Sequence, residues 1–473
     1  MIADLKPYAE YKESGLPWLG RVPAHWNIKR AKSILQRIDQ RSSTGKEELL
    51  TVSSVRGVLP RKTAAVTMFK AESYLGYKLC WPGDLVINSL WAWAGGLGVS
   101  NYHGIISSAY GVFRTRTDAG MLPRFLHEVV RSSSFNWEFK VRSKGVWISR
   151  LQLTDVSFLD APMHIPPHDE QVAIVRFLDW TNARLERTIR AKRKVIALLG
   201  EQKQAIIHRA VTRGLDPSIA LKPSGIPWLG DIPQHWEVSP LKSVCAVQSG
   251  ITLGKDYAGQ VIRKYPYLRV ANVQAGHVNL ADVKVIEVTK AEAIRCMLQK
   301  GDVLMTEGGD PDKLGRGCVW DSQITPCVHQ NHVFAVRPNQ SRLEPHFLSA
   351  LMGTSYARAY FESTAKQTTN LASTNKTKIG MFKVLIPPVD EQKSVLWALA
   401  TEIRPVDTAI TRLEREIELF REYRTRLVAD VVTGKLDVRE AAARLHDQAP
   451  TEPIEDTADL IDGIDTDDEE TTA

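Results

Sequence analysis

The sequence predicts a mixed α/β (α+β) fold in which two globular domains, related by a pseudo-twofold axis, are separated by two long antiparallel helices forming a coiled coil. Three observations lead to this prediction. Three short motifs each occur twice, a heptad pattern of apolar residues follows the second motif in each copy, and the segments between motifs mix short apolar runs with glycine and proline. The chain of 473 residues is long enough for about three domains.

Three pairs of related segments define the repeat. SGLPWLGRVPAHW and SGIPWLGDIPQHW share nine of thirteen residues, and the pairs IPPHDEQ/IPPVDEQ and AVTRGLD/VVTGKLD follow in the same order. The pairs occupy residues 14–26 and 224–236, 165–171 and 386–392, and 210–216 and 431–437. The last two pairs have one offset of 221 residues, whereas the first has an offset of 210. The chain is therefore two copies of one plan, and their length difference lies between the first and second motifs.

The segments between the first and second motifs are expected to fold as related globular domains. Short β-branched runs such as LLTVSSV and YPYLRVANV alternate with glycine, proline and short helical pieces. Faint matching between PGDLVINSLWAWAGGLG (82–98) and KGDVLMTEGGDPDKLGRG (300–317) indicates one fold with diverged surfaces. Each segment predicts a mixed α/β domain of about 140 residues.

A long helix is predicted after each IPP motif. Alternating steps of three and four residues select eleven seam positions in each copy, and the two sets have the same register. Each apolar seam needs a cover, and the other helix is the obvious one. Asn182, Lys192 and Lys203 are polar, so they either fix the register or turn to solvent. The seam positions are Val175, Leu178, Asn182, Leu185, Ile189, Lys192, Ile196, Leu199, Lys203, Ile206 and Ala210, and Leu396, Leu399, Ile403, Val406, Ile410, Leu413, Ile417, Phe420, Arg424, Leu427 and Val431.

Local signals place the ends of these helices. Acidic residues at 169–170 and 390–391 complement the dipole of a helix start. Gly214 and Gly434 lie where the helices should end. Pro405 is expected to kink the second helix or to split off its first turns.

The charge of the chain is unevenly distributed. Residues 440–473 contain twelve acids and one arginine, and because the whole chain carries +7, residues 1–439 carry +18. A body this basic indicates a polyanionic partner, whereas the acidic tail is expected to be disordered. Five scattered cysteines without a CxxC pair, no apolar run of 18 residues and no signal peptide predict a cytoplasmic protein without structural zinc or membrane spans.

Motifs of catalysis are missing from the sequence. It has no phosphate-binding GxxxxGK[ST] loop, no HExxH, no GxSxG and no Asn/Asp-Pro-Pro-aromatic motif. HQNH at 329–332 could hold a metal, but a polar strand end that contacts DNA or solvent is the preferred interpretation. We therefore expect a chain that catalyses no reaction.

These features resemble the specificity subunit of type I restriction–modification systems. The resemblance rests on the duplicated SGxPWLGxxPxHW and IPPxDEQ motifs, the helices after them and the VTxxLD endings, and it covers about residues 10–440. It implies that each variable segment is a target recognition domain that reads one half of a bipartite DNA site. It also implies that the two helices set the spacer between the half-sites.

The resemblance further implies the partners of the chain. Two modification subunits dock on the helices, bind S-adenosylmethionine and methylate adenine N6 in double-stranded DNA. Restriction subunits, which use ATP and Mg, translocate and cleave. No cofactor or metal is expected on this chain itself, and helix residues that face away from the seam are expected to meet the modification subunits.

The motifs predict the division of the chain. Target recognition domains are expected at residues 1–166 and 216–387, long helices at 167–215 and 388–437, and an acidic disordered tail at 438–473. Twofold symmetry adds one further expectation. The second copy of the first motif directly follows the first helix, so residues 14–26 should pack beside residues of about 425–437 at the end of the second helix.

DNA-reading residues are expected in the variable segments, because a residue common to both copies cannot distinguish two different half-sites. Trp18, Trp26, Trp228 and Trp236 of the repeated motif are therefore expected to pack in the core. Arginine and lysine suit guanine or phosphate, and asparagine and glutamine suit adenine; Trp91 and Trp93 could equally be core residues. The DNA-binding candidates are Arg56, Lys62, Trp91, Trp93, Asn101, His103, Lys144, Arg150, Lys255, Arg263, Lys264, Asn272, Lys313, Arg316, Gln330, Asn331, Lys366, Gln367 and Asn370.

Two other functions stay open from the sequence. The chain could be the specificity subunit of a related system in which cleavage and methylation are fused in one partner chain. It could also be a coiled-coil adaptor that joins two proteins without binding DNA. The basic body and the divergence of the two globular domains speak against the adaptor.

Overall fold

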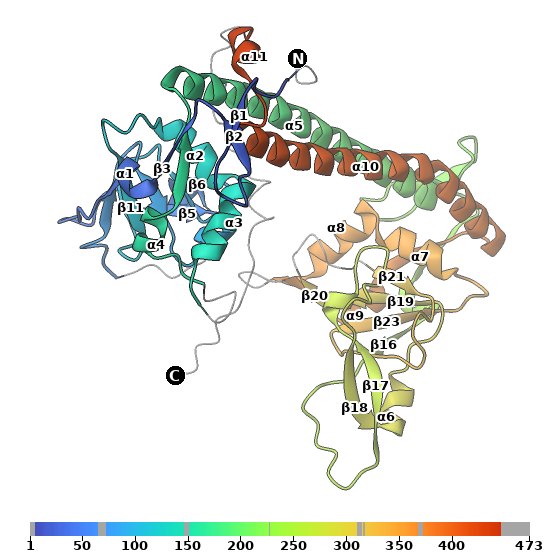
Figure 1. Cartoon of the computed structure of the whole chain (residues 1–473). Coiled ribbons are helices and arrows are strands. Elements are labelled where there is room, and N and C mark those ends of the chain that lie inside the picture. The colour runs from blue at the N-terminus through green and yellow to red at the C-terminus, as the bar shows by residue number, and fades with distance from the viewer. Residues whose placement is uncertain are drawn as a thin grey trace. The chain divides into compact units, whose positions relative to one another are not determined.

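The computed structural model describes residues 5–64, 72–145, 151–226, 228–309, 315, 317–367 and 372–445. Contacts divide the chain into two units, residues 1–192 with 415–473 (unit 1) and residues 193–414 (unit 2). Each unit contains one mixed α/β domain and one half of each long helix (Figure 1).

The two long helices are α5 (His168–Arg213) and α10 (Val389–Val432). Each has an Asp-Glu pair in its first turn, as expected. Gly214 directly follows α5 and Gly434 lies two residues after the end of α10, and they have φ of +74° and +75°. Only glycine adopts this left-handed conformation without a Cβ penalty, which explains why each helix ends there.

Pro405 lies inside α10 and does not divide the helix. A proline removes one backbone hydrogen bond from a helix. Its neighbour Val406 is buried, however, and Ile403 packs against the core of unit 2. Tertiary packing supplies most of the stability of a protein helix, so the first turns stay attached and the expected separation is wrong.

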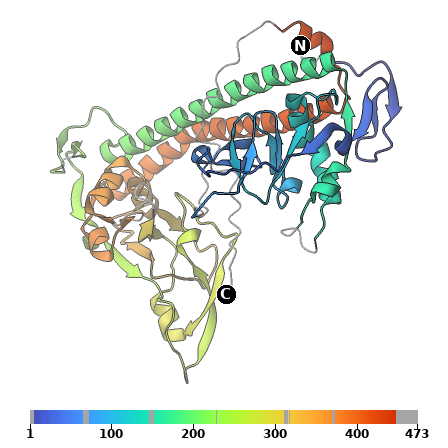
Figure 2. The same ribbon diagram turned by 90° about the vertical axis from the view of Figure 1, so that its left-hand side faces the viewer.

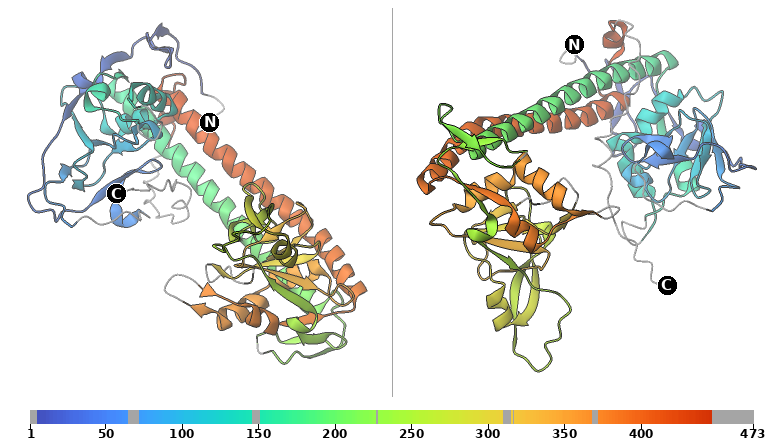
Figure 3. Two further views of the ribbon diagram at one scale, coloured as in Figure 1. Left: turned by 90° about the horizontal axis from the view of Figure 1, so that it is seen from below. Right: turned by 180° about the vertical axis from the view of Figure 1, so that it is seen from behind.

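In unit 1, the first half of α5 lies beside the last half of α10 (Figures 2 and 3). Lys192 Nζ donates to Glu416 Oε2 (2.5 Å), and Arg424 Nη1 donates to Glu186 Oε1 (2.8 Å). The earlier residue of α5 thus pairs with the later residue of α10, so the helix halves run antiparallel. Apolar seam residues around these pairs are buried: Leu178, Leu185, Ile189, Ile417, Leu427 and Val431.

In unit 2, the other halves of the two helices pair in the same way. Lys203 Nζ donates to Asp407 Oδ1 (2.6 Å). Lys203 and Asp407 are the counterparts of Arg424 and Glu186 at the offset of 221 residues. Lys192 and Lys203 therefore join the helices instead of turning to solvent, which decides between the two interpretations of these polar seam positions.

Both domains contain a four-stranded antiparallel sheet with equivalent strand order. The order is β4-β11-β8-β9 in unit 1 and β16-β23-β19-β21 in unit 2. The strands are β4 (Leu35–Arg37), β11 (Gly111–Thr115), β8 (Leu85–Ile87) and β9 (Leu97–Val99), and β16 (Cys245–Ser249), β23 (Val333–Pro338), β19 (Asp302–Thr306) and β21 (Gly317–Trp320). The same topology in both units confirms one mixed α/β fold used twice.

An ion pair between a buried aspartate and a partly exposed arginine repeats within these sheets. Asp84 accepts two hydrogen bonds from the Arg114 guanidinium (2.7 and 2.8 Å), and Asp302 accepts two from Arg337 (both 2.7 Å). Both aspartates belong to the faintly matching segments at 82–98 and 300–317. A buried carboxylate needs such a partner, so this match reflects a shared structural role.

Short ladders and helices complete the two scaffolds in matching order. Unit 1 has β1 (Tyr11–Glu13) with β2 (Arg21–Pro23), β3 (Asn27–Arg30) with β12 (Pro162–Ile165), and helices α1 (Ala31–Ile34), α2 (Pro123–Arg131), α3 (Ser133–Arg142) and α4 (Asp155–Leu159). Unit 2 has β13 (Leu221–Pro223) with β14 (Asp231–Pro233), β15 (Glu237–Pro240) with β26 (Lys383–Ile386), and helices α7 (Pro345–Met352), α8 (Ser355–Thr364) and α9 (Lys376–Met381).

The domains differ in the strands outside this scaffold. Unit 1 pairs β5 (Leu50–Ser53) with β6 (Gly57–Pro60) and β7 (Lys78–Cys80) with β10 (Gly104–Ile106). Unit 2 has a sheet of β18 (Lys284–Thr289), β17 (Ile262–Leu268) and β22 (Val328–His329) with α6 (Lys290–Arg295), and a small sheet of β20 (Gly308–Gly309), β25 (Ala372–Ser373) and β24 (Lys366–Gln367). Within unit 2, β17, β18 and α6 lie on the far side of the domain from α7 and α8 (Figure 1).

A short helix, α11 (Arg439–Ala443), follows α10. Val438, Ala441, Ala442 and Leu445 are buried in unit 1, and their spacing of three and four residues is that of an apolar helix face. The disorder expected for residues 438–473 is therefore wrong for 438–445, where this face outweighs the acidic composition. Residues 446–473 lie outside the described residues.

All five cysteines are free and buried. Burial raises the pKa of the thiols of Cys80, Cys245, Cys318 and Cys327 to about 12, so these side chains stay protonated. Within the described part of the chain, no group of three or more His, Cys, Asp or Glu side chains could hold a metal ion. No helix there is long and apolar enough to cross a membrane.

Candidate nucleic-acid interface

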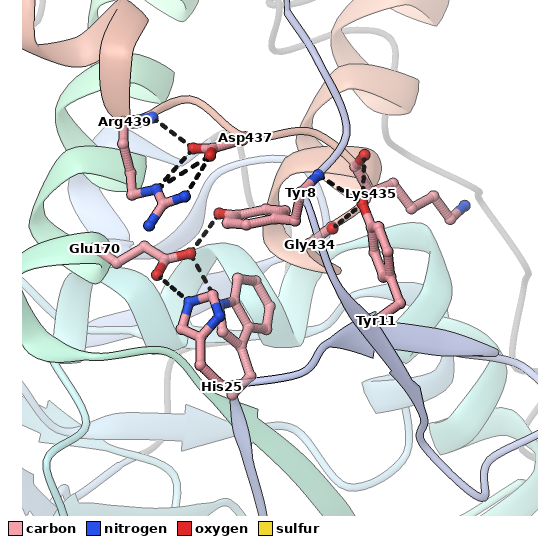
Figure 4. A network of polar contacts seen from close by, with 9 residues as sticks. Tyr8, Tyr11, His25, Glu170, Gly434, Lys435, Asp437 and Arg439 are labelled. Carbon is pink, nitrogen blue, oxygen red and sulfur yellow. Dashed lines mark hydrogen bonds and ion pairs between the residues drawn. The ribbon is translucent and has the colours of Figure 1, made fainter.

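The first and second repeated motifs bind each other through one buried glutamate in each unit. In unit 1, Trp26 is fully buried and its Nε1 donates to Glu170 Oε1 (2.8 Å). His25 Nε2 lies 2.7 Å from the other oxygen, Oε2 (Figure 4). The His-Trp end of SGLPWLGRVPAHW and the Glu of IPPHDEQ are thus two parts of one contact.

Unit 2 repeats this contact. Trp236 is fully buried and its Nε1 donates to Glu391 Oε1 (3.0 Å), and His235 Nε2 lies 2.7 Å from Glu391 Oε2. Trp rings that fill the core next to a helix start are packing residues. The expectation that Trp26 and Trp236 pack in the core is confirmed.

The glutamine of each IPPxDEQ motif ties the helix start to its domain. Gln171 Nε2 donates to the carbonyls of Pro166 (2.9 Å) and Gly120 (2.6 Å), and its Oε1 accepts from the backbone N–H of Leu122 (2.7 Å). Gln392 makes the corresponding bonds to Pro387 O, Arg342 O and Glu344 N, each 2.8 Å long. Both amides are buried, and the protein accepts both of their N–H bonds, so they position the helix and not a ligand.

The N-terminal motif lies beside the end of α10, as the symmetry argument predicts. Tyr11 Oη donates to Gly434 O (3.1 Å), and the backbone N–H of Asp437 donates to Lys6 O (2.8 Å). A Cβ atom on Gly434 would approach Pro23 Cδ to 2.4 Å and Trp26 to 3.0 Å. We call these contacts between residues 6–26 and 434–437 the clasp of unit 1.

Tyr8 adds a contact to the clasp that unit 2 lacks. Its hydroxyl donates to Glu170, and burial raises the pKa of Tyr8. The Arg439 guanidinium lies 5.1 Å from the Tyr8 ring centroid and pairs with Asp437 (Figure 4). The residue at the position of Tyr8 in the second copy is Ser218, which is exposed and bonds Asp216 instead.

The other two tryptophans of the motif differ between the units. Trp18 packs edge-on against Phe135, with ring centroids 5.0 Å apart. Trp228 is 47% exposed, so the expectation that it packs in the core is wrong. The chain turns at the neighbouring glycines of both copies, where Gly15, Gly20, Gly225 and Gly230 have positive φ.

The structure places most DNA-binding candidates of unit 1 on its surface. Trp91 is 43% exposed and stacks on Trp93 at 6.0 Å, so the alternative of a core residue does not hold for Trp91. Lys62 pairs with Glu48 (2.6 Å), which partly neutralises its charge. The exposed candidates are Arg56, Lys62, Trp91, Asn101, His103 and Lys144; Trp93 is partly buried, and Arg150 lies outside the described residues.

Arg131 brings two of these candidate loops together, and the sequence did not single it out. Its guanidinium donates to the carbonyls of Ser54 and Val55 beside Arg56 (2.8 and 2.7 Å), and to those of Gly95 and Leu97 after the Trp91–Trp93 segment (3.1 and 2.7 Å). Burial lowers its pKa. Arg131 thus positions a surface that carries one arginine and two tryptophans.

In unit 2, the candidates lie on several loops and strands. The N–H of Asn331 donates to Ile251 O (3.0 Å), which places the Gln330–Asn331 turn beside the loop that leads to Lys255. Lys255 pairs with Glu292 (2.5 Å) and Lys264 with Glu287 (3.6 Å). The exposed candidates are Lys255, Arg263, Lys264 and Lys366, and the partly buried ones are Gln330 and Asn331. Gln367 belongs to β24, but its side chain is not described. Lys313, Arg316 and Asn370 lie outside the described residues.

Two polar residues of unit 2 are structural instead. Asn272 is 3% exposed, and its amide donates to Asn279 O (2.9 Å) and Asp282 O (3.0 Å). The Arg269 N–H donates to the amide oxygen of Asn272, so Asn272 as a DNA contact is a wrong prediction. His329 of HQNH is fully buried, with Nδ1 2.6 Å from Val333 O. The polar residues that follow it in the sequence gave no indication of this burial.

Comparison with known sequences identifies the relatives. Residues 233–419 match the model of the type I restriction modification DNA specificity domain. The chain is similar to curated type I specificity subunits over part of its length. The putative type I restriction enzyme MjaX specificity subunit of Methanocaldococcus jannaschii is 25% identical over 43% of this chain and 47% of its own length. The EcoKI specificity subunit of Escherichia coli (strain K12) is 23% identical over 66% of this chain and 65% of its own length.

The matched regions thus span about half to two thirds of these relatives. A solved structure described as "Structural basis underlying complex assembly and conformational transition of the type I R-M system" contains a chain with a TM-score of 0.58 at 17% identity. That match covers 88% of this chain and 99% of the other, and it supports the mixed α/β fold. The resemblance seen in the repeated motifs is confirmed by the matching domain and relatives.

Proposed function

We propose that the chain is the DNA-binding specificity subunit of a type I restriction–modification enzyme and catalyses no reaction itself. Each target recognition domain reads one half of a bipartite DNA site. The observation that carries this proposal is the contrast between the two units. Their scaffolds share several matched contacts, from Trp26–Glu170 and Trp236–Glu391 to the Asp–Arg pairs of the sheets, while their outer strands and loops differ.

This contrast is what reading two different half-sites requires. A scaffold can be common to both domains, but surfaces that recognise different bases must differ. In unit 1, the loops joined by Arg131 present Arg56 and Trp91, an arginine for guanine or phosphate beside an exposed ring. In unit 2, Lys255, Arg263 and the Gln330–Asn331 turn offer a different set of donors.

The long helices give the proposed spacer and docking sites. We propose that α5 and α10 form an antiparallel coiled coil with an approximate twofold axis that relates the target recognition domains 1–166 and 216–387. The matched ion pairs Lys203–Asp407 and Arg424–Glu186 support this symmetry. Two modification subunits would dock on the helices and bring S-adenosylmethionine, and restriction subunits would bring ATP and Mg.

Mapping of N6-methyladenine tests the proposal. The chain is co-expressed with its cognate modification subunit in a host, and methylated adenines are located across the genome. The expected motif has two fixed parts and a constant gap. A contiguous motif would contradict the two-domain arrangement, and a chain that supports no methylation and does not retard DNA in a gel would favour the adaptor.

A further inference from the structure

The two long helices have few identical residues in the stretch between the repeated motifs at their ends. When residues 172–210 are compared with 393–431 at the offset of 221, five positions are identical. Three of them belong to the seam: Leu178/Leu399, Ile189/Ile410 and Ile196/Ile417. Seam residues are shared because each helix must cover the other. The remaining two pairs, Leu198/Leu419 and Glu201/Glu422, lie outside the seam and need another reason.

Leu198 and Leu419 are exposed in their respective units. Leu198 is 53% exposed in unit 2, and Leu419 is 47% exposed in unit 1. A single exposed leucine requires no explanation. The same exposed leucine in both copies does, because the residues around it have diverged: Val195 and Ala197 in one helix correspond to Glu416 and Glu418 in the other.

Each leucine is flanked by a base and an acid on its own face of the helix. Lys194 and Arg415 precede the leucines by four residues, and Glu201 and Glu422 follow them by three. Residues at these spacings are neighbours on a helix surface. All four flanking side chains are exposed, so each helix presents a stripe of base, leucine and acid. We call these two stripes the leucine stripes.

Ion pairing within one helix does not account for the shared charges. Arg415 pairs with Glu418 (2.8 Å) and Glu422 with Arg426 in unit 1. In the first copy, the positions of Glu418 and Arg426 are Ala197 and Ala205. The stripe is therefore kept in both helices while the partners within each helix are not.

We propose that the leucine stripes are two equivalent docking sites, each for a helix of one copy of the modification subunit. This rests on the proposed function. The loops that read different half-sites must differ, whereas surfaces that hold two identical partners must match. The docked helix would offer an apolar pocket to Leu198 or Leu419, an acid to Lys194 or Arg415, and a base to Glu201 or Glu422.

Counting the bound subunits tests the proposal. The full chain and its variants Leu198→Glu, Leu419→Glu and the double variant are purified with the modification subunit, and the complexes are weighed by native mass spectrometry. We expect two bound subunits for the original chain, one for each single variant and none for the double variant. Loss of a buried apolar anchor at an interface centre should weaken each site by roughly 30-fold.

Trp397 provides the matched control. It lies on α10, is 74% exposed, and corresponds to Arg176 in the first copy, so it is exposed but not shared. Trp397→Glu should keep both subunits, and Leu198→Met with Leu419→Met should keep both as well. Circular dichroism and melting temperature of each variant chain alone should match those of the original, because the changed side chains are exposed.

The outcomes separate this inference from the proposed function. If the original chain binds two modification subunits and the folded double variant still binds two with unchanged affinity, the leucine stripes are not the docking sites and the proposed function stands. If the original chain binds no modification subunit, the proposed function itself is contradicted.

Discussion

At the scale of single residues, His164 marks a chemical difference between the two scaffolds. It lies fully buried in β12 and stacks on Trp26 with ring centroids 5.4 Å apart. One ring nitrogen contacts Val432 O, and the other, Nδ1, has no hydrogen-bond partner. Desolvation lowers the pKa of His164 from 6.5 to about 4. The equivalent residue of unit 2 is Leu385, which packs in an apolar core.

This histidine should make unit 1 sensitive to acid. Below pH 6.5 the unfolded chain binds a proton at His164, whereas the folded chain stays neutral there until about pH 4. The free energy of unfolding therefore falls as pH drops between these values, by up to about 3 kcal/mol. His164→Leu should flatten this part of the pH dependence, measured as melting temperature from pH 8 to 4. An unchanged slope would show that His164 is not the group responsible.

Glu170 should contribute more to stability than its counterpart Glu391. Its side chain is 4% exposed and accepts from Tyr8, Trp26 and His25, whereas Glu391 is 26% exposed and contacts two donors. Glu170→Gln turns an amide donor toward buried donors and should cost about 2 kcal/mol. Glu391→Gln is the matched control with a smaller cost. Equal losses of melting temperature in the two variants would contradict the role assigned to Tyr8.

Single residues were predictable from the sequence where the repeat constrained them. Trp26 and Trp236 had to have a role common to both copies, and packing is such a role. Asn272 and Arg131 belong to no repeated motif, and they donate hydrogen bonds to backbone carbonyls elsewhere in the chain. Sequence patterns carry no information on which carbonyls a fold brings near a side chain. Asn272 was therefore assigned wrongly as a DNA contact, and Arg131 was missed.

At the scale of elements, the polar seam pairs should fix the register of the helices. Lys203→Asp places two acids together at Asp407 and should lower the melting temperature by about 2–4 °C, since a partly exposed ion pair contributes about 1 kcal/mol. Asp407→Lys in the same chain restores the pair and should restore the melting temperature. The exposed Arg187 is the control, because Arg187→Asp should not be rescued by Asp407→Lys.

The elements were predictable in proportion to their length and periodicity. Eleven seam positions in each copy predicted α5 and α10, and glycines with positive φ end both helices. Strands of three to six residues in the four-stranded sheets carry too few positions to show a period. The brief helix α11 was missed because the four buried apolar residues in and beside it stand at the edge of an acidic stretch.

At the scale of the whole molecule, the repeat explains why the first motif occurs twice. In unit 2 the chain runs without a break from the end of α5 through residues 214–221 into the second copy of the motif. In unit 1 the same position, after α10, is occupied by the N-terminal segment, with Lys6 bridged to Asp437. The non-covalent contacts of the clasp hold the first motif beside the end of α10. In unit 2, the covalent chain holds the second copy of the motif beside the end of α5.

A rearranged chain should therefore fold as the original does. Paired residues on antiparallel strands have Cα atoms about 5 Å apart, so a four-residue Gly/Asn linker can join Asp437 to Lys6. New ends can be opened between the exposed residues Pro217 and Ser218.

The permuted chain should have a melting temperature within a few degrees of the control. This control is the original chain shortened after Asp437, so that both chains lack α11. With the modification subunit, it should direct methylation to the same bipartite motif. A permuted chain that melts far below this control would mean that the 214–221 connection of unit 2 is more than a covalent equivalent of the clasp.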